Sequence, residues 1–516
     1  MLKKLLLMLT LIFCFTLTAC AEDNKEITLL YIPMDERPVN LDYVADTINA
    51  TSFNLLLPPE EYLPHIKQPG QVDKLWQWLF DNCSQADYLV LSADALVYGG
   101  LTPSRIHNLD QATLTDRVDK FNQLKQQNPD AKLYVFSTLM RTHKGNTNVA
   151  EPDYYGTYGS RIFQLTALRD KAEIEGLAAA EEVKLNQLLT DIPGDVLTDW
   201  YQRREKNLAI NRQLLEQTKT NVMDYMILCR DDTLSYSQSH KEYRSLTEEI
   251  AALDAAKYNS FPGADEVGLV LLTRALNDAQ GNTPAVYTSY APGRGANTTP
   301  KYEDVTLGES VTAHIVAAGG KVIAEPEQAD LILAVNTPED GVIGEAGSAA
   351  NVAEPKRTTT ALVNDISRHI GKGRRVAVAD VALANGADNS LMATLANQKL
   401  LPQLTAYAGW NTAGNTVGYA LAQGMLSQDI GEADRLHLLA VRLLDDWGYQ
   451  ANVRSQVQQG NINKYNLGPD KGPVATEIEQ QLKTFATDNL KDFPIDQLKV
   501  DLPWNRTFDI LLEVEP

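Results

Sequence analysis

Two adjacent carboxylates, Asp231 and Asp232, follow the apolar run 225–229, which has the length and composition of a buried strand. Two carboxylates held close together repel each other, and their proximity raises the pKa of one member of such a pair, as a general acid requires. We therefore interpret Asp231 and Asp232 as the candidate catalytic residues. The structural alternative is that one of them caps a following helix.

Other polar side chains stand where further strand-like runs end, and the carboxyl ends of parallel strands usually carry the binding site. The candidates for substrate binding are Asp35, Glu36, Arg37, Asp94, Arg141, Asp380, Asn385, Asp388, Trp410, Asn411 and Asn415. Trp410 stands among asparagines and glycines, as in a platform that binds sugars. Structural alternatives remain for several of them: Asp35 as a helix cap, Glu36 and Arg37 as an ion pair, Asp94 as a turn residue, Arg141 as a surface residue, and Trp410 as part of the core.

The common signatures of other enzyme classes are missing from the sequence. There is no G-x-x-x-x-G-K-[ST], no complete G-x-G-x-x-G, no G-x-S-x-G and no H-E-x-x-H. The seven histidines are scattered, which argues against a histidine-rich zinc site. We expect neither a cofactor nor a resident metal. A metal-dependent hydrolase stays a rival, because the abundant carboxylates and asparagines would suit Mg²⁺, Mn²⁺ or Ca²⁺.

Short apolar runs alternate with longer amphipathic stretches over most of the chain. The strand-like runs are 27–33, 53–57, 88–92, 133–138, 225–229, 285–290, 331–336, 376–380 and 404–407. Such alternation predicts the α/β class, with a mostly parallel sheet and helices on its faces. The number of units admits a (β/α)-barrel or two doubly wound halves. We expect a signal peptide over 1–19, a barrel-like catalytic part over 20–300, a second α/β part over 301–424, and a mostly helical region over 425–516.

The first residues have the pattern of a bacterial lipoprotein signal. Lys3 and Lys4 precede an apolar run, 5–17, which is shorter than the roughly 20 residues needed to span a bilayer. The run ends in Leu-Thr-Ala-Cys, which resembles a lipobox. We therefore expect a protein outside the cytoplasm, in the cell envelope, anchored to a membrane only through a lipid on Cys20.

The composition excludes some partners. The formal net charge of −21 makes a protein that binds nucleic acid or an anionic membrane surface improbable. Cys83 and Cys229 lie beside or within apolar runs, so buried thiols are expected, although a disulfide between them stays open.

Several segments resemble the bacterial domain-of-unknown-function family 4127. They are residues 31–40 (YIPMDERPVN), 231–232 (DD), 263–266 (GADE), 301–304 (KYED), 385–388 (NGAD) and 407–415 (YAGWNTAGN). The resemblance runs over nearly the whole chain after the signal. It implies a secreted or envelope-associated bacterial protein, and it implies no particular activity.

The Asp-Asp pair is also similar, locally, to hexosaminidases that use the acetamido group of their substrate as nucleophile. The resemblance implies that Asp231 orients the acetamido group and that Asp232 is the general acid. We therefore expect a glycoside hydrolase that acts on an envelope or host glycan, in particular on an N-acetylhexosamine. The alternatives are a glycan-binding lipoprotein without catalysis and the metal-dependent hydrolase. Nothing in the sequence indicates the linkage or an oligomeric state.

Overall fold

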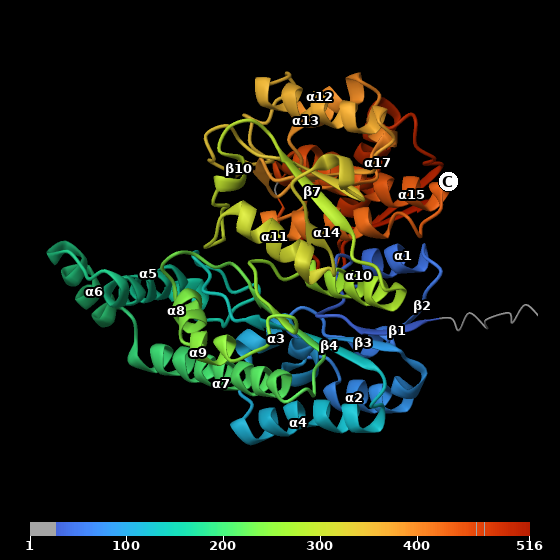
Figure 1. Cartoon of the computed structure of the whole chain (residues 1–516). Helices are drawn as coiled ribbons and strands as arrows, with labels where there is room; N and C mark the ends of the chain where they lie inside the picture. Colours follow the sequence, from blue (N-terminus) through green and yellow to red (C-terminus); the bar gives the residue numbers. More distant parts are fainter. Residues whose placement is uncertain (1–26, 461, 469, 516) are drawn as a thin grey trace, which may run out of the picture.

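The computed structural model describes residues 27–460, 462–468 and 470–515. The expected signal peptide and Cys20 lie outside these residues. Within the described part the chain forms two α/β halves, each built around a parallel sheet, and a C-terminal region that packs on the second half (Figure 1). No helix in this part of the chain is long and apolar enough to cross a membrane.

The first half contains six parallel strands in the spatial order β2-β1-β3-β4-β5-β6. They are β1 (Thr28–Ile32), β2 (Asn54–Leu56), β3 (Tyr88–Ser92), β4 (Lys132–Leu139), β5 (Tyr225–Arg230) and β6 (Tyr258–Asn259). The central strands are apolar on both faces because helices cover both faces of the sheet. The helices are α1 (Asp42–Asn49), α2 (Val72–Asn82), α3 (Leu101–Ile106), α4 (Gln111–Gln127), α5 (Tyr155–Ile174), α6 (Ala179–Asp191), α7 (Gly194–Lys219), α8 (Gln238–Arg244), α9 (Thr247–Ala251) and α10 (Val267–Gln280).

The second half contains five parallel strands in the order β13-β11-β9-β7-β8. They are β7 (Ala285–Tyr290), β8 (Lys321–Val322), β9 (Leu331–Asn336), β11 (Val376–Asp380) and β13 (Ala406–Ala408), and a small separate pair is formed by β10 (Gly344–Glu345) and β12 (Leu383–Ala384). The helices are α11 (Leu307–Ala317), α12 (Arg357–Gly371), α13 (Asn389–Asn397) and α14 (Ala413–Leu426). The first strand of this sheet precedes residue 300, where the sequence suggested a boundary.

Two apolar helices lie between the sheets. α10 packs on β1, β3 and β4, α14 packs on β9, β11 and β13, and the two helices contact each other (Figure 1). All side chains of α14 are buried, as expected for a helix with no face in water. All but four of the fourteen residues of α10 are buried, and Gly281 ends the helix in the left-handed conformation at φ 66°.

The α/β class and the mostly parallel sheets are confirmed, but the barrel expected over 20–300 is not. The six strands form an open sheet whose edges, β2 and β6, are not paired with each other. In both halves the second strand lies outside the first and the third lies on the other side, which is the order of flavodoxin-like doubly wound sheets. Of the two topologies that the sequence admitted, the chain adopts two doubly wound halves.

The C-terminal region is helical and closes with a hairpin. Its elements are α15 (Glu432–Arg442), a π-helical stretch (Leu443–Val453), α16 (Arg454–Gln458), α17 (Gly472–Asn489) and the antiparallel strands β14 (Gln497–Asp501) and β15 (Leu511–Glu515). The connection between β14 and β15 matters for the site described next, because it turns back toward the junction of the two halves.

Candidate active site

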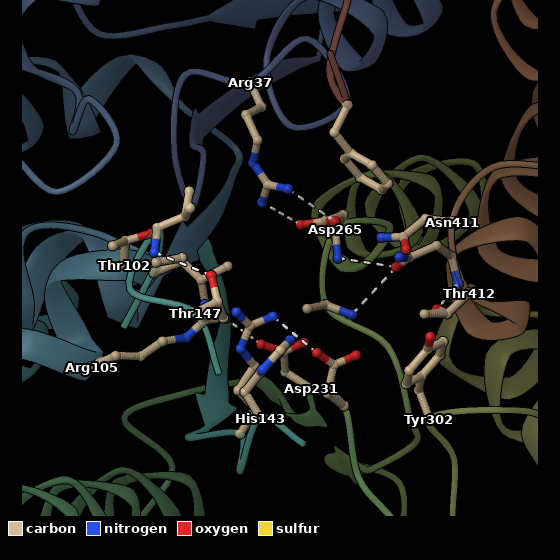
Figure 2. Close-up of a pocket in the computed structure, with 18 of the residues that line it drawn as sticks. Arg37, Thr102, Arg105, His143, Thr147, Asp231, Asp265, Tyr302, Asn411 and Thr412 are labelled. Carbon is tan, nitrogen blue, oxygen red and sulfur yellow. Dashed lines mark hydrogen bonds and ion pairs between the residues drawn. The ribbon is translucent and has the colours of Figure 1, made fainter. Parts of the chain in front are cut away.

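Loops that follow the strands of both sheets line one pocket of about 290 Å³ (Figure 2). The first half supplies charged side chains: Arg37, Arg105, Arg141, Asp231, Asp232 and Asp265. The second half supplies mainly neutral polar ones: Tyr302, Glu303, Asn385, Asn411, Thr412 and Asn415. The C-terminal region adds Tyr465, Trp504, Arg506 and Phe508. The pocket therefore lies where the carboxyl ends of two doubly wound sheets meet, which is the expected place for a ligand.

The structure brings many of the sequence-predicted residues together. Seven of them line this pocket: Arg37, Arg141, Asp231, Asp232, Asn385, Asn411 and Asn415. They come from segments that are far apart in the sequence, so the fold, and not local sequence, makes them neighbours. The hydrogen bond from the Asp265 amide to Asn415 Oδ1, at 3.2 Å, joins the two halves beside the pocket.

The Asp231–Asp232 pair belongs to a charge cluster. Arg105 donates to Asp231, and Arg141 Nη1 lies 2.9 Å from Asp232 Oδ2. Both guanidinium groups also face Glu151, which is buried and accepts from Arg141 Nε at 2.7 Å. Two arginines thus face three carboxylates, so the cluster favours a positive charge in the pocket.

A second cluster surrounds Arg37. Arg37 Nη1 donates to Asp265 Oδ2 at 3.2 Å (Figure 2). Arg37 Nη2 also lies 2.9 Å from Asp35 Oδ2. Asp509 lies between Arg37 and Arg506, and it accepts from Arg506 Nε. Burial raises the pKa of Asp265 to about 6, and the attraction of Arg37 opposes this rise. This cluster, like the first, contains two arginines and three carboxylates, which are Arg37, Arg506, Asp35, Asp265 and Asp509.

Glu303 differs from every other carboxyl group of the pocket. It is 3 % exposed, its Oε1 accepts the amide hydrogen of Gly414 at 2.8 Å, and its Oε2 has no hydrogen-bond partner among the residues described. No lysine, arginine or histidine among the described residues forms an ion pair with it. An unpaired carboxylate would be very costly to bury, so Glu303 is held as the neutral acid.

The surroundings of Glu303 agree with that protonation state. Burial is the largest cause that raises the pKa of Glu303 to about 8, and the negative charges of Glu266 and Asp304 add to it. The Gly414 amide and Arg230 act in the opposite direction. Arg230 is ion-paired with Asp304 at 3.0 Å.

Backbone strain concentrates at this pocket. Eight non-glycine residues of the described chain have a positive φ, and four of them line the pocket: Asp232 (42°), Tyr302 (67°), Asn385 (63°) and Asn411 (63°). Asp and Asn tolerate this conformation, whereas an aromatic residue such as Tyr302 pays a cost of roughly 1–3 kcal/mol. Strain of this kind collects where function requires a particular geometry.

Asp35 and Glu36 were predicted to bind substrate but lie behind the pocket lining. Asp35 is buried, where it holds Arg37 and accepts from Asn40 Nδ2 at 2.6 Å. Glu36 Oε1 accepts from the Trp504 indole at 2.6 Å, and the ring of Trp504 lies 4.9 Å from the Arg37 guanidinium. Burial raises the pKa of Glu36 to about 8. Both residues therefore support side chains that line the pocket.

Asp94, Asp380 and Asp388 were also predicted to bind substrate, and none of them lines the pocket. Asp94 is buried at the first position of a π-helical turn (Asp94–Tyr98), accepts the Thr138 amide hydrogen at 2.8 Å, and has a pKa raised to about 6 by burial. Asp380 is fully buried at the end of β11, and burial, then the charge of Asp388, raises its pKa to about 7. Asp388 caps α13.

Trp410 is a core residue. Its side chain is 4 % exposed, its ring lies 5.7 Å from the ring of Phe508, and it does not line the pocket. The position follows a buried strand, β13, and the indole packs against Phe508, which does line the pocket. The aromatic rings that do line the pocket come from the C-terminal region, together with Tyr302.

Sequence reasoning did not select several residues of the site: Arg105, Glu151, Asp265, Glu303, Tyr465, Trp504 and Arg506. Two of them stand in segments quoted for the family resemblance, Asp265 in 263–266 and Glu303 in 301–304, so that signal could have found them. Arg105 and Glu151 carry no local signal, because only the fold brings them to Asp231 and Arg141.

The state of the two cysteines was also predicted from the sequence. Cys83 and Cys229 are both buried free thiols, as expected. Across the described ranges no group of three or more His, Cys, Asp or Glu side chains is arranged so that it could hold a metal ion.

The chain was compared with known proteins. The comparison with curated proteins found no match. One family profile matches nearly the whole chain, from residue 29 to residue 513, and its description is protein of unknown function (DUF4127). This range includes both halves and all the pocket residues described above, and it agrees with the resemblance seen in the sequence. The chain therefore belongs to the DUF4127 family of proteins of unknown function.

Proposed function

We propose that the protein is a glycoside hydrolase of the cell envelope that cleaves an envelope or host glycan. One observation carries the proposal: a neutral buried carboxyl group, Glu303, and two arginine-paired carboxylates, Asp231 and Asp232, line the same pocket. Glycoside hydrolysis requires one carboxyl group that donates a proton and a second that stays ionised. Environments that separate the protonation states of neighbouring carboxyl groups mark such a division of roles.

In the proposed reaction Glu303 and the Asp231–Asp232 pair have different roles. Glu303 gives its proton to the glycosidic oxygen while the bond from that oxygen to the anomeric carbon breaks and its electron pair stays with the oxygen. Positive charge develops on the sugar ring, and the excess negative charge of the Asp231–Asp232 cluster stabilises it. In the last step the oxygen of a water molecule bonds to the anomeric carbon, and the water gives up one proton. In a direct displacement an ionised carboxylate of the pair takes this proton. If a carboxylate or acetamido oxygen has first bonded to the anomeric carbon, that bond breaks as water attacks, and the ionised Glu303 takes the proton.

This scheme keeps the Asp-Asp pair as catalytic and moves proton donation from Asp232 to Glu303. The reason is charge: Asp232 forms an ion pair with Arg141, a partner that suits a carboxylate, whereas no cationic side chain of the described residues pairs with Glu303. That Asp231 orients an acetamido group stays a prediction. It applies to substrates that contain an N-acetylhexosamine. Asn385, Asn411 and Asn415 would bind sugar hydroxyl groups, together with Arg37 and Arg141.

The direct test is a screen of the purified protein against a panel of aryl glycosides that includes N-acetylhexosaminides. We expect release of the aryl alcohol from at least one sugar, and activity that is retained in EDTA. Loss of activity in EDTA would favour the metal-dependent hydrolase instead. Sugar binding without turnover on the whole panel would favour the glycan-binding alternative and would contradict the proposal.

The location is tested separately. If the protein is a lipoprotein, replacing Cys20 by Ala removes the thiol that accepts the lipid. Cells fed a radioactive fatty acid should label the wild-type protein, and the label should be absent from Cys20→Ala. A wild-type protein that takes up no label would overturn the lipid anchor, although it would not affect the proposed chemistry.

A further inference from the structure

Tyr465 is an exposed aromatic side chain at the edge of the pocket. Its side chain is 57 % exposed, and it is the only aromatic residue among the large apolar side chains that stay exposed in the described chain. The other residues of that group, which are Ile174, Val183, Leu189, Val316, Val322, Val342 and Val352, do not line the pocket. Single exposed apolar residues are common, so the position of Tyr465 is what distinguishes it.

The backbone holds Tyr465 in place on both sides. The Thr507 amide donates to the Lys464 carbonyl at 3.1 Å, and the Leu467 amide donates to the Asn505 carbonyl at 2.7 Å. These bonds tie the loop 463–468 to the segment that carries Trp504 and Arg506 into the pocket. Tyr465 therefore has a defined place beside the site, although its ring contributes little to the core.

The size of the pocket limits what it can enclose. A volume of about 290 Å³ lies at the lower end of the range for small-ligand sites, so there is room for little more than one sugar ring. A longer glycan must leave the pocket over its edge. The C–H face of a sugar ring is apolar and packs well on an aromatic ring, and an exposed tyrosine offers such a ring with a polar hydroxyl at its tip.

We propose that Tyr465 is the platform for the sugar next to the one held in the pocket, so that the substrate is an oligosaccharide or polysaccharide chain and not a single glycoside. This inference rests on the proposed function. The Lys464 ammonium, 5.0 Å from the ring centroid of Tyr465, lies over one face of the ring and leaves the other face to the sugar.

The test compares Tyr465→Ala with Tyr465→Phe on two substrates of the sugar identified by the screen. One substrate is an oligosaccharide of that sugar. The other is the glycosyl fluoride of the same sugar, whose leaving group is fluoride and contains no ring. Tyr465→Ala should lower kcat/KM on the oligosaccharide by roughly 5- to 30-fold and leave the fluoride unchanged. Tyr465→Phe keeps the ring and should behave as wild type. Val342→Ala, which removes an exposed apolar side chain away from the pocket, is the control.

The outcomes separate this inference from the proposed function. Unchanged kcat/KM of Tyr465→Ala on the oligosaccharide overturns the platform and leaves the hydrolase intact, and so does an equal loss on both substrates. If the wild type hydrolyses nothing, the hydrolase fails, and calorimetric binding of chitotetraose by the wild type and by Tyr465→Ala decides the platform. Weaker binding by Tyr465→Ala supports it; equal binding, or no binding by the wild type, overturns it.

Discussion

Replacing Glu303 by Gln is expected to lower kcat/KM on a natural oligosaccharide by roughly 10²–10⁴, the usual contribution of a general acid. The amide has nearly the shape of the carboxylic acid, and its oxygen can still accept the Gly414 amide hydrogen. It cannot give up a proton to the leaving oxygen. A glycosyl fluoride needs little protonation of its leaving group, so on that substrate the variant should lose much less.

The pH dependence of kcat/KM tests the role of Glu303 in a second way. A general acid must be protonated, and burial raises the pKa of Glu303 to about 8. Wild-type kcat/KM on the oligosaccharide should therefore fall as the pH rises through about 8, and this fall should be absent in Glu303→Gln. The charged groups around Glu303 are Glu266, which contacts His314, and the Arg230–Asp304 ion pair. Full activity of a folded Glu303→Gln, with an unchanged alkaline limb, would refute its role as the acid.

Replacing Asp232 by Asn should lower turnover of the oligosaccharide and of the fluoride alike, by roughly 10²–10³. The substitution removes a negative charge that faces the developing positive charge of the sugar, and leaving-group chemistry cannot compensate for that loss. Asp232 has φ 42°, and Asn tolerates this conformation as well as Asp does, so the backbone should stay as it is. The melting temperature checks that the variant is folded.

Asp153→Asn is the matched control for Asp232→Asn, because the Asp153 side chain is 90 % exposed and its ion pair is with Lys67 at the surface. It should keep wild-type kinetics. The two site variants should then differ in how their loss of activity depends on the substrate. Glu303→Gln should lose activity mainly on the oligosaccharide, which has the poor leaving group, whereas Asp232→Asn should lose it equally on the oligosaccharide and the fluoride. If a folded Asp232→Asn shows the selective loss instead, the original prediction that Asp232 donates the proton is the better one. If it keeps full activity, the pair is not catalytic.

Local pattern was sufficient for the longer strands of the two sheets, because each of the nine strand-like runs overlaps a strand, but it did not predict the two-residue strands β6, β8, β10 and β12. The run 225–229 is β5, and the apolar stretch after Gly263 is α10, because buried strands and buried helices require apolar side chains of a given length and period. The closure of the sheet was not predictable in this way. A barrel and an open doubly wound sheet both use the same alternating units, and the choice depends on which strands pair at the edges, which are contacts distant in sequence.

For the site, the position of a residue directly after a strand was a good guide to whether it lines the pocket. The type of the residue was a poor guide. Arg37, Arg141, Asp231, Asp232 and three asparagines reached the pocket because carboxyl ends of parallel strands converge. Asp94 and Trp410 follow strands as well, but their side chains turn into the interior. Whether a residue after a strand points into the pocket or into the core depends on packing against other elements, and no local pattern encodes that.

The sequence by itself determined the α/β class, the strand and helix segments, the family and the Asp-Asp pair, because each of these depends on residues close together in the chain. Only the tertiary structure decided that the carboxyl ends of two open sheets share one pocket and that Arg105 and Arg141 are the partners of the Asp-Asp pair. It also decided that Glu303 is buried with no cationic partner in the part of the chain that the structure describes. The protonation state of a carboxyl group depends on burial and on charges within a few ångströms of it, and both depend on which distant segments the fold brings together.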